Sequence, residues 1–150
     1  MDTIFCIDIG SNSVRAALVS RGEAQYKLSR ITKLSEGLSG SGALSDSAMR
    51  RTLEAIKEYA LMAKDLGIKP CIFGTEAFRR AVNGREFADL IEKSVGTGVK
   101  ILSPFEEAQA GYSGAVKGLK GGGFTVIDLG GASTEIVKGG ENVEDYISLP

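Results

Sequence analysis

Residues 3–20 read TIFCIDIGSNSVRAALVS, and this stretch decides the fold of the chain. The segment Thr3–Ile9 is mostly apolar and ends at Gly10, which is typical of a buried strand. A second apolar segment, Val14–Ser20, follows after a few small polar residues, and Ala24–Thr32 is a third with rough alternation. Because only short turns separate these segments, we predict a three-stranded antiparallel meander.

Beyond the meander, helical and strand patterns alternate. Ser45 is a good N-cap for a helix whose apolar residues recur at helical spacing until Gly67, and Glu36–Leu44 is predicted as a flexible loop. The other expected strands are Lys69–Gly74, Val99–Leu102, Thr125–Leu129, Thr134–Lys138 and Tyr146–Leu149, and the other expected helices are Glu76–Val82, Arg85–Ser94 and one running from Ser103 to about Val116. This order predicts an α/β domain with a mixed sheet.

The composition excludes several classes of protein. The 150 residues carry 18 basic and 19 acidic side chains, a net charge of −1, and no histidine, which excludes catalysis and metal sites that need histidine. No block is basic enough for duplex nucleic acid, and no apolar run approaches the ~20 residues that span a membrane. Cys6 and Cys71 lie in apolar runs, so we expect buried free thiols of a reducing compartment, the cytoplasm.

An internal repeat relates residues 4–19 to residues 124–139 at an offset of 120 positions. The identical residues are Ile7, Asp8, Gly10 and Ser13 in the first copy and Ile127, Asp128, Gly130 and Ser133 in the second. Each copy is predicted as a hairpin with a turn of small residues, whose backbone N–H groups can converge on an anion. An aspartate beside such an anion would act through a divalent cation. The alternative is two ordinary tight hairpin turns.

The two turns, Asp8–Arg15 (DIGSNSVR) and Asp128–Glu135 (DLGGASTE), resemble the phosphate motifs of the exopolyphosphatase / guanosine pentaphosphate phosphohydrolase (Ppx/GppA) family. Further segments fit the family in order, namely Leu34–Leu38, Thr75–Ala81 with Asn83, Ser103–Ala108 and Ser148–Pro150. The resemblance implies a ribonuclease H-like fold of the actin-like ATPase superfamily, with two lobes and the site in the cleft between them. Ala132 departs from the family, which usually has a third glycine there.

Members of the family are longer than this chain. We therefore expect residues 1–120 to form the first lobe and residues 121–150 to form the hinge and the opening hairpin of a truncated second lobe. The strands between residues 125 and 149 would then expose apolar surface or pair with another copy as a homodimer.

The resemblance also implies roles for particular residues. Glu106 is the expected catalytic base, although Ser103 and Glu106 are also spaced as a helix capping box and Glu107 is the second choice. Asp128, and next Asp8, would hold Mg²⁺, and Glu135 would orient the water or the metal. Arg79 would bind phosphate or be a solvated helix arginine. The other expected phosphate contacts, largely through main-chain amides, are Ser11, Asn12, Ser13, Gly130, Gly131, Ser133 and Thr134.

The function implied by the resemblance is hydrolysis of terminal phosphoanhydride bonds in inorganic polyphosphate, guanosine pentaphosphate or both. In this reaction Mg²⁺ assists the attack of a glutamate-activated water. Two alternatives stay open, a kinase or ATPase of the wider superfamily and a non-catalytic module that binds polyphosphate or an alarmone. We expect the isolated chain to bind phosphate without turning it over.

Overall fold

The structure is a computed structural model that describes residues 3–131 and 133–149. The chain divides into two compact units, unit 1 (Met1–Ile101) and unit 2 (Leu102–Pro150). Among the described residues, no helix is long and apolar enough to cross a membrane.

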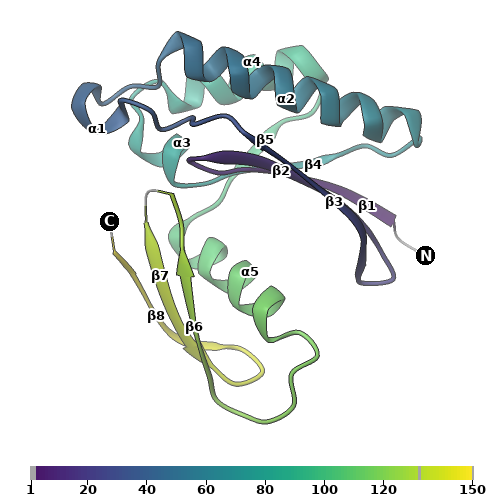
Figure 1. Cartoon of the computed structure of the whole chain (residues 1–150), viewed down its shortest axis with the longest axis vertical. Coiled ribbons are helices and arrows are strands. Elements are labelled where there is room, and N and C mark those ends of the chain that lie inside the picture. Colours follow the sequence, from purple (N-terminus) through teal and green to yellow (C-terminus); the bar gives the residue numbers. More distant parts are fainter. Residues whose placement is uncertain (1–2, 132, 150) are drawn as a thin grey trace. The chain divides into compact units, whose positions relative to one another are not determined.

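Unit 1 is built on a five-stranded mixed sheet in the order β3-β2-β1-β4-β5 (Figure 1). Its strands are β1 (Thr3–Ile9), β2 (Ser13–Ser20), β3 (Glu23–Ile31), β4 (Cys71–Gly74) and β5 (Val99–Ile101). The first three strands pair antiparallel, whereas β4 runs parallel to β1 and β5 runs parallel to β4. The predicted meander and the predicted mixed sheet are both confirmed.

The helices of unit 1 are α1 (Leu38–Ser41), α2 (Asp46–Asp65), α3 (Glu76–Arg80) and α4 (Gly84–Val95). Ser45 caps α2 as predicted, because its side chain accepts a hydrogen bond from the Ala48 N–H at 3.3 Å. Helix α1 lies inside the segment that was predicted as a loop. Gly37 and Gly42 adopt left-handed conformations at its ends, with φ of 78° and 71°, and so allow a single short helical turn between them.

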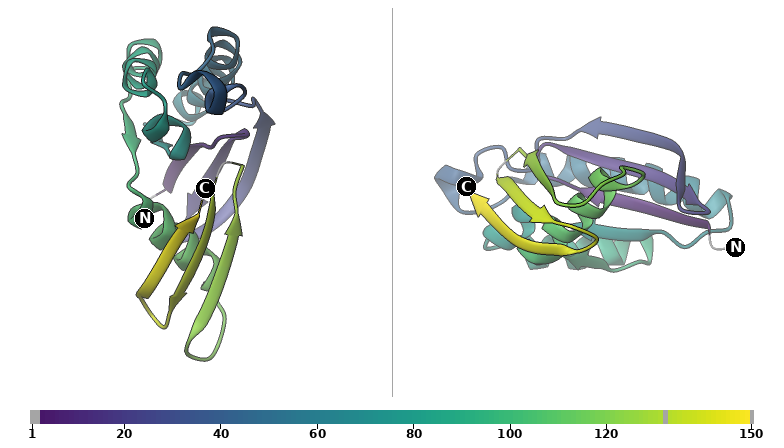
Figure 2. Two further views of the ribbon diagram at one scale, coloured as in Figure 1. Left: turned by 90° about the vertical axis from the view of Figure 1, so that its left-hand side faces the viewer. Right: turned by 90° about the horizontal axis from the view of Figure 1, so that it is seen from below.

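The core of unit 1 lies between its sheet and helices α2 and α4, which cover one face (Figure 2). Side chains alternate along β1, so Phe5, Ile7 and Ile9 point toward this core and are fully buried. They share one apolar cluster with Ile56 of α2 and Ile91 of α4. The alternation therefore decides which face of the sheet the helices cover.

The same alternation places Cys6 on the opposite face. Cys6 is half-buried and Cys71 is exposed, so the prediction of two buried thiols is wrong for Cys71. An apolar run indicates a strand, but it does not tell which of its two faces is covered. Burial raises the pKa of the Cys6 thiol, and the neighbouring Cys71 raises it further.

Unit 2 contains helix α5 (Pro104–Val116) and strands β6 (Phe124–Leu129), β7 (Thr134–Gly139) and β8 (Val143–Leu149). The strands form an antiparallel sheet in the order β6-β7-β8. Helix α5 packs on one face of this sheet, where Ala108, Tyr112 and Val137 form a small buried cluster. Since α5 groups with the later strands, the compact units divide after Ile101, while the lobe boundary expected at residues 120 and 121 stays a prediction.

The other face of the unit 2 sheet carries exposed aliphatic side chains. Ile127 of β6 is 62% exposed and Leu129 is 78% exposed, and Ile147 and Leu149 of β8 are also exposed. Ile127 pairs with Ile136, which pairs with Ile147, so an isoleucine row crosses all three strands. The prediction of exposed apolar surface in this segment is confirmed.

Helix α3 ends at Arg80, two residues earlier than predicted, and turns directly into α4. The Asn83 side chain fixes this turn, because its Oδ1 accepts from the Leu44 N–H at 2.8 Å and its Nδ2 donates to the Leu44 carbonyl at 3.0 Å. The backbone of Gly84 lies so close to Phe78 that a Cβ at position 84 would collide with the Phe78 carbonyl oxygen.

We expect Gly84→Ala to lower the free energy of unfolding by about 1–3 kcal/mol, since α3 and α4 must separate to accommodate the methyl group. Gly40→Ala is the matched control, because a Cβ at position 40 meets no atom within 4 Å. Urea unfolding of both variants measures the difference. Equal unfolding midpoints for the two variants would show that the helix junction is not tightly packed at Gly84.

Candidate functional site

The turn between β1 and β2 is held by its backbone. The Gly10 N–H donates to the Ser13 carbonyl at 3.0 Å. The carbonyl of Ser11 accepts from the Ser35 N–H, and the carbonyl of Asn12 accepts from the N–H groups of Thr32 and Lys33, all at 2.9–3.0 Å. In a planar trans peptide the C=O and the following N–H point in opposite directions. The N–H groups of Asn12 and Ser13 therefore point away from residues 32–35.

The turn between β6 and β7 repeats this arrangement 120 residues later. The Gly130 N–H donates to the Ser133 carbonyl at 2.9 Å, which is the counterpart of the bond from Gly10 to Ser13. A Cβ on Gly130 would approach the Ser133 carbonyl oxygen to 2.9 Å, so a side chain there would disturb the bond. Ala132, the departure from the family pattern, lies outside the described residues, and its effect stays a prediction.

The carboxylates follow the same register in both hairpins. Asp8 pairs across the strands with Arg15, and Asp128 pairs with Glu135 at the corresponding positions. Asp8 is half-buried, whereas Asp128 is exposed and lies against α5, where its Oδ2 is 3.6 Å from the site of a Cβ on Gly111. The Asp128 carboxylate therefore lies beside α5 at Gly111.

Glu135 is a buried acid. Its side chain is on a residue only 5% exposed, and its Oε1 accepts a hydrogen bond from the Ser148 hydroxyl at 3.0 Å. Asp128 lies directly across the strands from it, and two carboxylates at such a position repel each other. A hydrogen bond and a bound cation are two ways in which proteins offset such repulsion.

Glu106 occupies the third position of α5 and completes a capping box. Its Oε2 accepts from the Ser103 N–H at 2.8 Å, while the Ser103 hydroxyl oxygen accepts from the Glu106 N–H at 3.2 Å. Figure 1 shows that α5 begins at the end of unit 2 where β6 ends and β7 begins. The positive end of the α5 dipole and the Gly130 turn thus share one end of unit 2.

Arg79 lies on α3, which follows the carboxyl end of β4 in unit 1. Ile9, at the end of β1, pairs with Gly74 in parallel β4, so α3 begins at the edge that carries the Gly10 turn. The Arg79 Nη2 lies 2.8 Å from the Glu76 Oε2, and the arginine side chain is 18% exposed. The alternative of a solvated Arg79 is therefore wrong, whereas its contact with phosphate stays a prediction. Arg80 is more exposed, at 39%.

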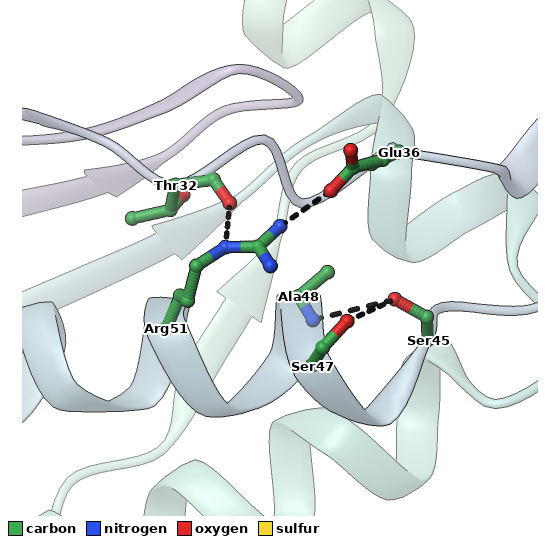
Figure 3. A network of polar contacts seen from close by, with 6 residues as sticks. All are labelled: Thr32, Glu36, Ser45, Ser47, Ala48 and Arg51. Atoms are coloured by element: carbon green, nitrogen blue, oxygen red, sulfur yellow. Dashed lines mark hydrogen bonds and ion pairs between the residues drawn. The ribbon is translucent and has the colours of Figure 1, made fainter.

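Arg51 of α2 stabilises the segment behind the first turn (Figure 3). Its Nε donates to the Thr32 carbonyl at 3.1 Å, and its Nη2 donates to the Glu36 Oε2 at 2.7 Å. Residues 32–35 in turn hold the carbonyls of Ser11 and Asn12. Glu36 lies in the Leu34–Leu38 segment, which fits the family pattern. The sequence alone does not assign this segment a role.

The structure thus gathers the expected residues into two groups, one in each unit. Unit 1 carries Asp8, Ser11, Asn12, Ser13 and Arg79 at one edge of its sheet, and unit 2 carries Glu106, Asp128, Gly130, Gly131, Ser133, Thr134 and Glu135 around α5 and the β6–β7 hairpin. Among the described residues, no three Cys, Asp or Glu side chains form a ready metal cluster. Mg²⁺ commonly binds through one or two carboxylates plus phosphate oxygens, so the Asp128 and Glu135 oxygens fit it chemically.

Solved structures define the class of fold. The chain is similar over 99% of its length to a Ppx/GppA family member from Aquifex aeolicus, with 34% identity and a TM-score of 0.83, and covers 51% of that chain. It superposes on an exopolyphosphatase from Cytophaga hutchinsonii with a TM-score of 0.89 at 22% identity, over 99% of this chain and 50% of that one. MreB5 of Spiroplasma citri shares the fold at a TM-score of 0.55 and 16% identity, with 99% and 52% of the two chains covered. The chain is an actin-like α/β lobe.

The sequence comparison then identifies the family. Residues 7–150 match the Ppx/GppA phosphatase family, and the chain belongs to it. The chain is 33% identical to exopolyphosphatase 2 of Mycobacterium tuberculosis over 156 aligned positions. The alignment covers 93% of this chain and 49% of that protein. It therefore spans about half the length of the curated relatives it matches.

Glu106 has a structural role in the capping box, and this role can be measured separately from any role in catalysis. We expect Glu106→Ala to lower the free energy of unfolding by about 0.5–2 kcal/mol, since the Ser103 N–H loses its acceptor. Glu106→Gln should lose less, because a glutamine oxygen at this position also accepts the bond. Urea unfolding measures both, with Ser103→Ala as a positive control. If alanine and glutamine destabilise equally, the hydrogen bond to Ser103 does not stabilise α5.

Proposed function

We propose that this chain carries half of a phosphoanhydride hydrolase site that releases terminal phosphate from inorganic polyphosphate, guanosine pentaphosphate or both. The observation that carries the proposal is the turn that occurs twice, with the same bond from glycine to serine and an aspartate two residues before the glycine. Family membership supports the same reaction class. Cytoplasm is the proposed compartment, since both cysteines are free.

The turns would bind phosphate through main-chain N–H groups. Ser11 and Ser133 are each 9% exposed and would contribute mainly their main-chain N–H groups, whereas Asn12, Gly130 and Gly131 are exposed. Successive N–H groups on a turn of small residues make an anion-binding concavity. Ser13 and Thr134, which are partly exposed, would add hydroxyl contacts.

Glu106 would take the proton from the attacking water. Its bond with the Ser103 N–H fixes the direction of the carboxylate, which a general base needs for in-line attack. Arg79, held by Glu76, would bind the terminal phosphate, and Glu135, held by Ser148, would orient the water. Asp128, with Asp8 second, would hold Mg²⁺, which when bound neutralises phosphate charge.

Two other functions compete with this one. A kinase or ATPase of the actin-like class would bind adenine nucleotide and leave polyphosphate intact. A non-catalytic module would bind polyphosphate or an alarmone without releasing phosphate, and we propose this behaviour for the isolated 150-residue chain. The proposal also includes a homodimer in which a second copy covers the exposed aliphatic side chains of β6 and β8.

Replacing Glu106 with glutamine should lower phosphate release by about 10²–10⁴-fold while leaving substrate binding in place, because the general base is lost but the turns are intact. The assay measures release from both substrates, with and without Mg²⁺, in the whole protein. Glu107→Gln is the matched control, since Glu107 is the next residue and is similarly half-buried. If Glu106→Gln keeps turning over and Glu107→Gln does not, the base is Glu107.

Asp128→Asn should raise the Mg²⁺ concentration for half-maximal activity by at least about tenfold, because an amide oxygen binds the ion more weakly than a carboxylate. A Mg²⁺ titration of activity measures this change. Asp145→Asn is the control, since Asp145 is an exposed aspartate of the same sheet, on β8. An unchanged titration for Asp128→Asn excludes this residue as a ligand.

A further inference from the structure

Two thiols lie side by side on the open face of the unit 1 sheet. Cys6 of β1 is the register partner of Cys71 of β4, and the two strands run parallel. Register partners in a sheet direct their side chains to the same face. Their neighbours Ile7 and Ile72 are also partners and are both buried, so the two thiols share the face that α2 and α4 do not cover. The proposed function uses neither cysteine.

The pair is accessible. Cys71 is exposed, and Cys6 is half-buried and lines a pocket of about 420 Å³ together with Asp8, Arg15 and Lys27. On its other side Cys6 pairs with Ala17, whose methyl group leaves room beside the sulfur. A small polar reagent can therefore reach the pair from solvent.

The separation of the strands suits a bond between the two sulfurs. Neighbouring strands lie about 4.8 Å apart, within the roughly 4.4–6.8 Å range of Cα separations in disulfides. We propose that Cys6 and Cys71 are a modification site, a dithiol that hydrogen peroxide oxidises to an intramolecular disulfide. The bond would join β1 and β4 at Cys6, which precedes Asp8 by two residues and lies on the same face of the sheet.

The reaction takes place in two steps. The exposed Cys71 thiolate attacks the peroxide, the O–O bond breaks, and the products are a sulfenic acid on Cys71 and hydroxide. The Cys6 sulfur then attacks the Cys71 sulfur, the S–O bond breaks, and the hydroxyl group leaves with the Cys6 proton as water. Overall the two thiols lose two electrons and two protons, and one peroxide is reduced to two waters.

The test treats the 150-residue chain with hydrogen peroxide at low protein concentration, blocks remaining thiols and maps peptides without reductant. Trypsin places Cys6 in residues 1–15 and Cys71 in residues 65–79, because Lys69 precedes Pro70 and is not cut. The expected result is loss of both free thiols, an intact mass lower by two hydrogens and the two peptides joined, all reversed by dithiothreitol.

Two variants make the assignment specific. Cys6→Ser should stop at a sulfenic acid on Cys71, which dimedone traps, and Cys71→Ser should leave Cys6 reduced over the same time. Wild-type chain that instead gives disulfide-linked dimers, or over-oxidised Cys71 with Cys6 still reduced, would overturn the proposal. These readouts need no phosphate substrate, so they are independent of the proposed hydrolase activity.

Discussion

One hydrogen bond, formed twice, sets the geometry on which the candidate site depends. The N–H of Gly10 or Gly130 donates to the carbonyl of the serine three residues later and closes each hairpin. The bond leaves little space at the glycine, since an added Cβ would lie 3.3 Å or 2.9 Å from the serine carbonyl oxygen. It also fixes the register, which places Asp8 opposite Arg15 and Asp128 opposite Glu135.

The parts of the fold that local signals control could be predicted from the sequence. Apolar runs bounded by small residues gave the strands, and Ser45 and Ser103 gave the starts of α2 and α5, because capping depends on residues only three positions apart. Two errors have non-local or subtle causes. Helix α1 needs left-handed glycines at both ends, and the exposure of Cys71 depends on which sheet face the helices cover.

The candidate site also has a part that could be predicted from the sequence and a part that could not. The motif residues could be found from the repeat and the family resemblance, and the capping box at Glu106 from its local spacing. The contacts that join distant segments could not be found. Arg51 follows Glu36 by 15 residues, and Ser148 follows Glu135 by 13 residues, so no local sequence pattern predicts either contact. Such supporting contacts depend on tertiary packing, and they orient groups that react only in a fixed geometry.

The two copies of the repeat differ in the charge of the residue that pairs with the aspartate. In unit 1 the partner of Asp8 is Arg15, so the cross-strand pair has no net charge, whereas in unit 2 the partner of Asp128 is the buried acid Glu135. Two facing carboxylates favour a cation between or near them, and an aspartate facing an arginine does not need one. This difference in charge supports placing Mg²⁺ at Asp128 ahead of Asp8. Under the proposed function, the first turn would contact phosphate oxygens directly, since the arginine across the strands from Asp8 offsets the charge of that carboxylate.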